Sequence, residues 1–558
     1  MLGILDALHE ARSPEPRSGM GGFWVLILLF VAAGASTRCA PAAKGVDAPL
    51  HEFSAGRALE HLQEIAVAPH PTGSAEGRRV AETLVEALNE LGCAVTIPEA
   101  PHTRWLINIL GELPGSSDRP GLLLVAHHDS TPSGPGASDD GAGVAALLEI
   151  ARALAIDEHR TRPITFLFTD GEELGLFGIR ALLQAKWPFE SYAAVLNVEA
   201  TGNRGATVLF ETAGDTGDLI AAWSEGSPSP AGSSLYQAIY DALPNNTDFS
   251  PIRRSGLRGL NFALVGGNSA YHAPFDTPEH LDRGSLQAMG DTLLGTVRAW
   301  DRRGQGSAPR RVFHDVIGRW VISIDAAWAP WLAGIVGILL TAWILRTATF
   351  RLLPGALLFI GFTVLIALGS KFLQPYLDRG AEWAVTRFYE PHPRGDAMST
   401  WCTALGLVLF FAAGARLLAR KFDTCSSGLV LQAGRLLWSI ALFLLAYFEP
   451  EFAVILTVPV CAGVLSSATA SRFPWLSGAL AGISVMWLVH AWFSVVLLTS
   501  KVPAISAAAG ATSLWLGLPL LGDAVLSSPH RNHILDRTLL ATGFCVLGIA
   551  ALGRASGW

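Results

Sequence analysis

A series of long apolar segments in the second half of the sequence limits the possible folds more than any other feature. From about residue 327 the chain carries eight of them, at roughly 327–345, 352–370, 399–415, 427–447, 452–470, 474–499, 503–522 and 538–553. A transmembrane helix needs about 20 consecutive apolar residues, and eight such segments in series do not suit a water-soluble core. The segments predict a C-terminal, all-α, polytopic transmembrane domain of about eight helices within residues 311–558.

The overall composition agrees with a membrane protein. Half of the 558 residues are hydrophobic and only 16% are charged, whereas a soluble globular chain carries about 25% charged residues. The net charge of −7 argues against nucleic acid as a partner, because nucleic-acid binders present a basic face. The composition therefore predicts a lipid bilayer as one partner and excludes nucleic acid.

The N-terminus holds one more apolar stretch, residues 23–36, which follows Arg12 and Arg17. A cleaved signal peptide and a retained anchor are both compatible with it, and we favour an anchor within residues 1–44 that follows a cytoplasmic segment. Arginine and lysine in the short loops then place residues 45–310 outside the cytoplasm. The expected protein is multi-pass, with this domain in the periplasm of a bacterium or the lumen of a eukaryotic organelle.

Residues 45–310 have the pattern of a water-soluble α/β domain. Helical patterns alternate with short, almost entirely apolar runs at 122–126, 164–169, 193–198 and 260–265. Such runs between helices are typical of strands that are buried on both faces of a parallel sheet. We therefore expect a mostly parallel sheet flanked by helices.

The first of these runs ends in His127, His128 and Asp129. Side chains alternate between the two faces of a strand, so His127 and Asp129 share a face and His128 points away. A neutral histidine is a good zinc ligand, and a neighbouring carboxylate can fix its tautomer.

Acidic residues stand at the ends of later segments. The glycine-rich stretch 136–143 can bring Asp139 or Asp140 into a pocket, although an Asp before a helix is more often an N-cap. The run 164–169 leads to Glu172 and Glu173, where one acid can bind a metal while the other holds a water; a solvated acidic turn is the alternative. Glu199 ends the next run, and His272 lies in a loop rich in proline.

The combination of these residues predicts a metal centre. In open α/β sheets the ligand crevice lies at the carboxyl ends of the strands. Two histidines and three carboxylates suit two zinc ions, with one Asp bridging them. Spacings of 12, 34, 26 and 73 residues between successive candidates exclude a local zinc finger, so the fold has to assemble the site.

Five ordered motifs resemble the co-catalytic di-zinc aminopeptidase family, which includes glutamate carboxypeptidase and glutaminyl cyclase. They are His-x-Asp-Ser at 127–130, Gly-Ala-x-Asp at 136–139, Glu-Glu-Leu-Gly at 172–175, Glu199, and Tyr-His at 271–272 with Asp-Thr at 276–277. The resemblance covers about residues 50–300. A peptidase domain followed by membrane spans is similar to the branch of endoplasmic reticulum metallopeptidase and vacuolar membrane protease.

This resemblance implies a role for each residue. One zinc would be bound by His127, Asp139 and Glu199, and the other by Asp139, Glu173 and His272. Glu172 would be the general base, Asp129 the partner that orients His127, and Tyr271 a stabiliser of the oxyanion. Many family members carry Asp where this chain has Glu199, so the longer side chain is a departure from the pattern.

The expected protein is a membrane-bound zinc metallopeptidase of the aminopeptidase type that acts on peptides with a free N-terminus. A transporter or receptor whose outer domain binds peptides without hydrolysis is an alternative, and a glutaminyl-cyclase-like enzyme is another. The sequence leaves the oligomeric state open.

Overall fold

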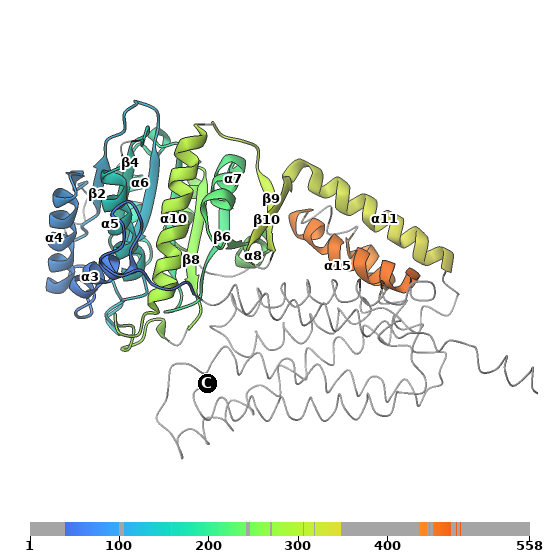
Figure 1. The fold of residues 1–558 in the computed structure, drawn as a ribbon, viewed down its shortest axis with the longest axis horizontal. Helices are drawn as coiled ribbons and strands as arrows, with labels where there is room; N and C mark the ends of the chain where they lie inside the picture. Colours follow the sequence, from blue (N-terminus) through green and yellow to red (C-terminus); the bar gives the residue numbers. More distant parts are fainter. Residues whose placement is uncertain are drawn as a thin grey trace, which may run out of the picture.

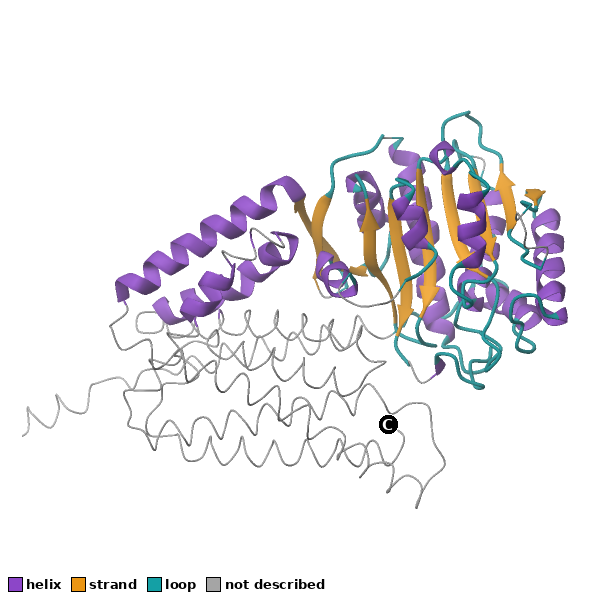
Figure 2. Cartoon of the chain, turned by 180° about the vertical axis from the view of Figure 1, so that it is seen from behind, coloured by secondary structure: helices purple, strands orange, loops and turns teal. Residues whose placement is uncertain are grey.

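The computed structural model describes residues 40–347, apart from 100–104, 158, 242–245, 268–269, 305 and 317. It also describes residues 435–442, 446, 450–469, 476 and 480. An eight-stranded sheet in the order β1-β2-β4-β3-β5-β8-β6-β7 forms the centre of the first part, with helices packed across it (Figures 1 and 2).

The four central strands are parallel to one another and completely buried. They are β4 (Ile164–Thr169), β3 (Leu122–His127), β5 (Ala194–Ala200) and β8 (Gly259–Val265). These are the four apolar runs that the sequence analysis assigned to strands. Burial on both faces explains why each run lacks the alternation of a half-exposed strand.

The outer strands make the sheet mixed, so the expectation of a mostly parallel sheet holds only for its centre. Three of the outer pairings, β1–β2, β2–β4 and β6–β8, are antiparallel, whereas β6 and β7 are parallel. The outer strands are β1 (Ala94–Thr96), β2 (Ile109–Leu113), β6 (Ala206–Ala213) and β7 (Ala231–Gly232).

Helices cover both faces of the sheet. They are α3 (Ala55–Ile65), α4 (Ala75–Glu90), α5 (Gly141–Ala155), α6 (Phe177–Gln184), α7 (Gly217–Gly226), α8 (Ser234–Tyr240), α9 (Phe249–Arg254) and α10 (Arg283–Arg303), with a 3₁₀ turn at Phe189–Ser191. Buried side chains of α3, α4, α5, α7 and α10 form the main core against one face. The smaller core on the other face takes its helical side chains from α6 and α9.

The alternation of side chains along the strands decides on which face of the sheet the candidate site lies. In β3, Leu124 packs in the main core, whereas Leu123 and Val125 pack in the smaller one. His127 is an even number of residues from Leu123 and Val125 and therefore points to the same face. Glu199 is likewise on the face of Val195, which also belongs to the smaller core. Both side chains therefore extend from the carboxyl ends of neighbouring strands toward the side of α6 and α9.

The chain continues beyond residue 310 with a hairpin and two long helices. Strands β9 (Arg311–Val316) and β10 (Trp320–Asp325) pair antiparallel, and a 3₁₀ turn at Ala326–Trp328 leads into α11 (Ala329–Thr347). Helix α11 packs against α15 (Pro450–Thr469), as Figure 1 shows. Phe313 of β9 belongs to the main core, so the hairpin is attached to the α/β domain.

Two of the eight apolar segments are described over most of their length, and both are helices, α11 and α15. Among the described residues, no helix combines the length and the apolarity that a membrane crossing requires. The N-terminal anchor and the other six segments lie wholly or mostly outside the described residues. The multi-pass arrangement and the boundaries at residues 44 and 310 stay predictions.

Candidate metal centre

His127 is oriented by the residues that follow it. Its Nδ1 lies 3.0 Å from the backbone oxygen of Asp129 and 3.5 Å from the carboxylate Oδ1 of the same residue. A carbonyl oxygen only accepts hydrogen bonds, so Nδ1 is the donor, and Nε2 is the nitrogen that faces the candidate ligands. His128 points the other way, as the strand alternation predicts, and its Nε2 bonds the backbone oxygen of Ile107 at 2.8 Å.

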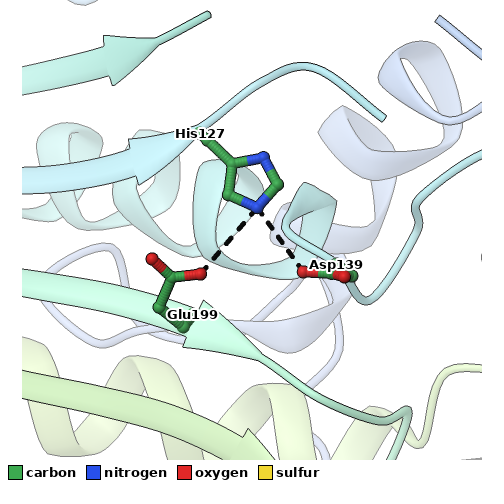
Figure 3. A group of neighbouring side chains, drawn as sticks. All are labelled: His127, Asp139 and Glu199. Atoms are coloured by element: carbon green, nitrogen blue, oxygen red, sulfur yellow. Dashed lines mark ion pairs between the residues drawn. The ribbon is translucent and has the colours of Figure 1, made fainter. Parts of the chain in front are cut away.

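The two adjacent aspartates have separate tasks. The Asp140 side chain accepts a hydrogen bond from the backbone N–H of Gly143 at 3.2 Å and is the N-cap of α5. Asp139 instead turns toward His127, whose Nε2 lies 3.4 Å from Asp139 Oδ1. Glu199 Oε2 lies 3.8 Å from the same nitrogen, and Figure 3 shows the imidazole pointing at both carboxylates. These three buried residues form one group of candidate ligands.

Asp139 also belongs to a second group. His272 Nε2 lies 3.3 Å from Asp139 Oδ2 and 3.0 Å from Glu173 Oε1. Within each group the candidate ligand atoms all lie within 4.8 Å of one another. Asp139 therefore offers one oxygen to each group, which is the arrangement of a carboxylate that bridges two ions.

The centre gathers buried carboxyl groups that a cation would stabilise. Among the described residues, Asp139, Glu173 and Glu199 have no ion pair with lysine or arginine; their ion-pair partners are the two histidines. Burial raises the pKa of Glu199 well above its usual value, and the charge of Glu172 raises it further. Burial opposes ionisation of Asp139 as well, but hydrogen bonds to His127 and His272 hold its pKa below the usual range. Buried carboxylates are stabilised by pairing with cations, and imidazole and carboxylate donors suit zinc.

Glu172 lies beside the ligands without belonging to either group. Its backbone N–H donates to Asp129 Oδ1 at 3.0 Å, and that of Glu173 donates to Asp129 Oδ2 at 3.2 Å. Asp129 therefore holds the acidic turn and lies next to His127 at the same time. Burial raises the pKa of Glu172 to about 8, and His127 opposes this shift.

Tyr271 lies against the second group. Its ring stacks on the imidazole of His272, with ring centroids 3.7 Å apart and an interplanar angle of 18°. Burial, followed by the charge of Asp139, raises the pKa of its hydroxyl above the usual value. The backbone of His272 has a φ of 54°, and Ser133 Oγ donates to its carbonyl oxygen at 2.8 Å.

Three further residues lie near the centre. Asp276 accepts hydrogen bonds from the backbone N–H of Ser138 at 2.8 Å and of Asp139 at 3.3 Å, and its position in the His272 loop was the available signal. For Asp248 the sequence allows either a brace of the substrate pocket or a helix cap; its side chain accepts a hydrogen bond from Thr169 Oγ1 and makes no cap hydrogen bond at the start of α9. The pKa of the buried Tyr240 hydroxyl is raised by burial and by nearby carboxylates, among them Glu199, and no sequence pattern marked this residue.

Part of the α/β domain is similar to known peptidases. Residues 108–297 match peptidase family M28. The chain is 32% identical over 251 residues to the vacuolar membrane protease of Candida dubliniensis, a match that covers 41% of this chain and 26% of that protein. Endoplasmic reticulum metallopeptidase 1 of Mus musculus is 27% identical over 307 residues, covering 49% of this chain and 34% of that protein. Part of the α/β domain is thus similar to peptidases of family M28, among them a protein named as a metallopeptidase.

A solved structure of a Zn-dependent exopeptidase from Parabacteroides distasonis also matches, with 21% identity and a TM-score of 0.35, over 45% of this chain and 99% of that one. The matched region spans about a quarter to a third of the length of the two curated relatives named above.

Proposed function

We propose that this protein is a membrane-bound aminopeptidase that uses two zinc ions. The observation that carries the proposal is Asp139, which has one carboxylate oxygen toward His127 and the other toward His272. In this proposal His127, Asp139 and Glu199 hold one zinc, and Asp139, Glu173 and His272 hold the other. Zinc in such a site lowers the pKa of a bound water and polarises a carbonyl group.

The remaining residues act on protons and charge. Glu172 takes the proton of the attacking water and returns it to the leaving amine. Its burial supports this role, since a raised pKa suits a group that has to take up and release a proton near neutral pH. Tyr271 donates a hydrogen bond to the oxyanion that forms on the substrate carbonyl. Asp129 is a positioning residue, because it holds His127 and the backbone of Glu172 together.

Membrane attachment is the second part of the proposal. The relatives are named a vacuolar membrane protease and an endoplasmic reticulum metallopeptidase, and the apolar segments after residue 327 supply candidate spans. The peptidase domain would then lie on the extracytoplasmic side.

The test measures whether the purified full-length protein hydrolyses aminoacyl substrates that have either a free or an acetylated N-terminus. Activity should vanish with a zinc chelator, return with added zinc, and require the free amine. Hydrolysis of only the acetylated substrates would contradict the aminopeptidase assignment, and cyclisation of N-terminal glutamine without hydrolysis would favour a glutaminyl-cyclase-like enzyme. Undiminished hydrolysis after complete zinc removal would contradict the metallopeptidase itself.

A further inference from the structure

A line of buried polar side chains crosses three neighbouring strands beside the proposed first zinc site. In the sheet register Asn197 of β5 lies opposite Asn261 of β8, and Asn261 lies opposite Glu211 of β6. All three are almost completely buried. Buried polar groups cost free energy unless they are hydrogen-bonded, so a line of them inside a sheet core calls for an explanation.

These side chains form a continuous hydrogen-bond chain that ends at Glu199. Asn197 Nδ2 donates to Glu199 Oε1 at 3.1 Å and to Asn261 Oδ1 at 3.0 Å. Asn261 Nδ2 donates to Glu211 Oε2 at 2.9 Å. Arg253 Nη1 donates to the other oxygen of Glu211 at 2.8 Å. The hydrogen bonds therefore run from Arg253 on α9, through Glu211 and the two asparagine amides, to Glu199, a candidate zinc ligand.

Because Glu211 is an acceptor, it determines which group donates in each of these hydrogen bonds. An ionised carboxylate only accepts hydrogen bonds, so Asn261 has to present its NH₂ group to Glu211 and its oxygen to Asn197. Asn197 then has to present its own NH₂ group to Asn261 and to Glu199. An amide could otherwise turn by 180° and offer its oxygen instead.

The same arrangement divides the tasks of the two Glu199 oxygens. Oε1 is engaged by Asn197, while Oε2 faces His127 at 3.8 Å. A glutamate has one more rotatable bond than an aspartate, so an unrestrained Glu199 would sample more positions and lose more conformational entropy on binding an ion. The hydrogen bond from Asn197 removes part of this freedom in advance.

We propose that Asn197 is a positioning residue that holds Glu199 as a ligand through Oε2 alone, and that Glu211 acts through Asn261 to keep the Asn197 amide in the orientation that permits this. The inference rests on the proposed function, since it takes Glu199 as a zinc ligand. It concerns zinc affinity and does not depend on which substrate is cleaved.

The first test is the zinc affinity of the full-length Asn197→Leu variant, measured by competition with a chelator. Leucine is close to asparagine in size but donates no hydrogen bond. One of the two zinc ions should bind about 10–100-fold more weakly, the usual effect of losing a residue that supports a metal ligand. The matched control is Gln237→Leu, which removes a buried amide that bonds Thr212 and should leave zinc affinity unchanged. Unchanged zinc affinity in Asn197→Leu would overturn the proposal.

The second test uses Glu211→Gln, which preserves size and is less disruptive to folding. Arg253 keeps the oxygen of the new amide at position 211, so the NH₂ group of that amide faces the NH₂ group of Asn261. Asn261 and then Asn197 have to turn, which places the Asn197 oxygen against Glu199. Zinc affinity should fall at the same ion, and adding Glu211→Gln to Asn197→Leu should cause no further fall, because coupled residues are not additive.

Unaltered zinc affinity in Glu211→Gln would contradict the proposed action of Glu211 through Asn261 and Asn197. Losses of affinity that simply add in the double variant would contradict it as well. A wild-type protein that binds two zinc ions without peptidase activity would contradict the proposed function alone. The zinc affinities of the variants would then still test the role of Asn197. A wild-type protein that binds no zinc would overturn both.

Discussion

Glu172 and Glu173 are neighbours in the chain, but only Glu173 belongs to a ligand group. Glu172→Gln keeps the size of the side chain and removes its ability to accept a proton, so turnover should fall by about 10²–10⁴-fold while both zinc ions stay bound. Glu173→Gln removes an anionic ligand, so one zinc should weaken and excess zinc should restore part of the activity. Zinc content and turnover of both variants check this, and zinc loss in Glu172→Gln alone would mean that the two roles are exchanged.

At the residue scale, the sequence predicts the candidate site residues better than it predicts the directions of their side chains. Strand alternation was enough to separate His127 from His128, because a strand has only two faces. The glycine-rich loop did not distinguish Asp139 from Asp140: both readings were open, and the structure uses Asp140 as the cap and Asp139 in the two groups. The contacts of Asn197 and Tyr240 depend on distant strands and loops, and no local pattern reveals them.

At the scale of elements, Asp276 joins the loop that carries His272 to the loop that carries Asp139. Besides its backbone contacts it accepts a hydrogen bond from Ser138 Oγ. In Asp276→Ala the buried donors lose their acceptor, which should lower the free energy of unfolding by about 1–3 kcal/mol and weaken zinc binding in both groups.

The control for this prediction is Asp282→Ala. Asp282 is the N-cap of α10 and accepts from the backbone N–H of Ser285 at 2.7 Å, so its loss should cost about 1 kcal/mol without changing zinc affinity. Thermal unfolding and chelator competition on both variants separate the two effects. Equal zinc affinity in Asp276→Ala and the wild type would show that Asp276 supports the fold only.

The strands that sequence could predict and those it missed differ in burial and length. The four central strands are apolar at nearly every position and completely buried, so composition alone marks them. Strand β1 has three residues with none buried, and β7 has two residues. Such short outer strands form because a neighbouring strand offers free hydrogen-bonding groups, which is a tertiary effect without a local signal.

At the scale of the whole molecule, the predicted topology places the α/β domain outside the cytoplasm. A reporter that is active only outside the cytoplasm should be active when fused after Asp325, the end of β10. The same reporter should be silent after Lys421, since three of the predicted spans separate the two positions. The opposite pattern would contradict the proposed orientation, and activity at both positions would contradict the span count.

The direct test of the two-zinc centre is the number of zinc ions bound per chain, measured by elemental analysis after metal removal and reloading. The wild-type full-length chain should bind two. Asp139→Asn weakens the one ligand that both groups share, so it should lose affinity for both ions and bind fewer than one at the same free zinc concentration. A wild-type chain that binds a single zinc ion, or an Asp139→Asn variant that still binds two with unchanged affinity, would contradict a bridged two-zinc centre.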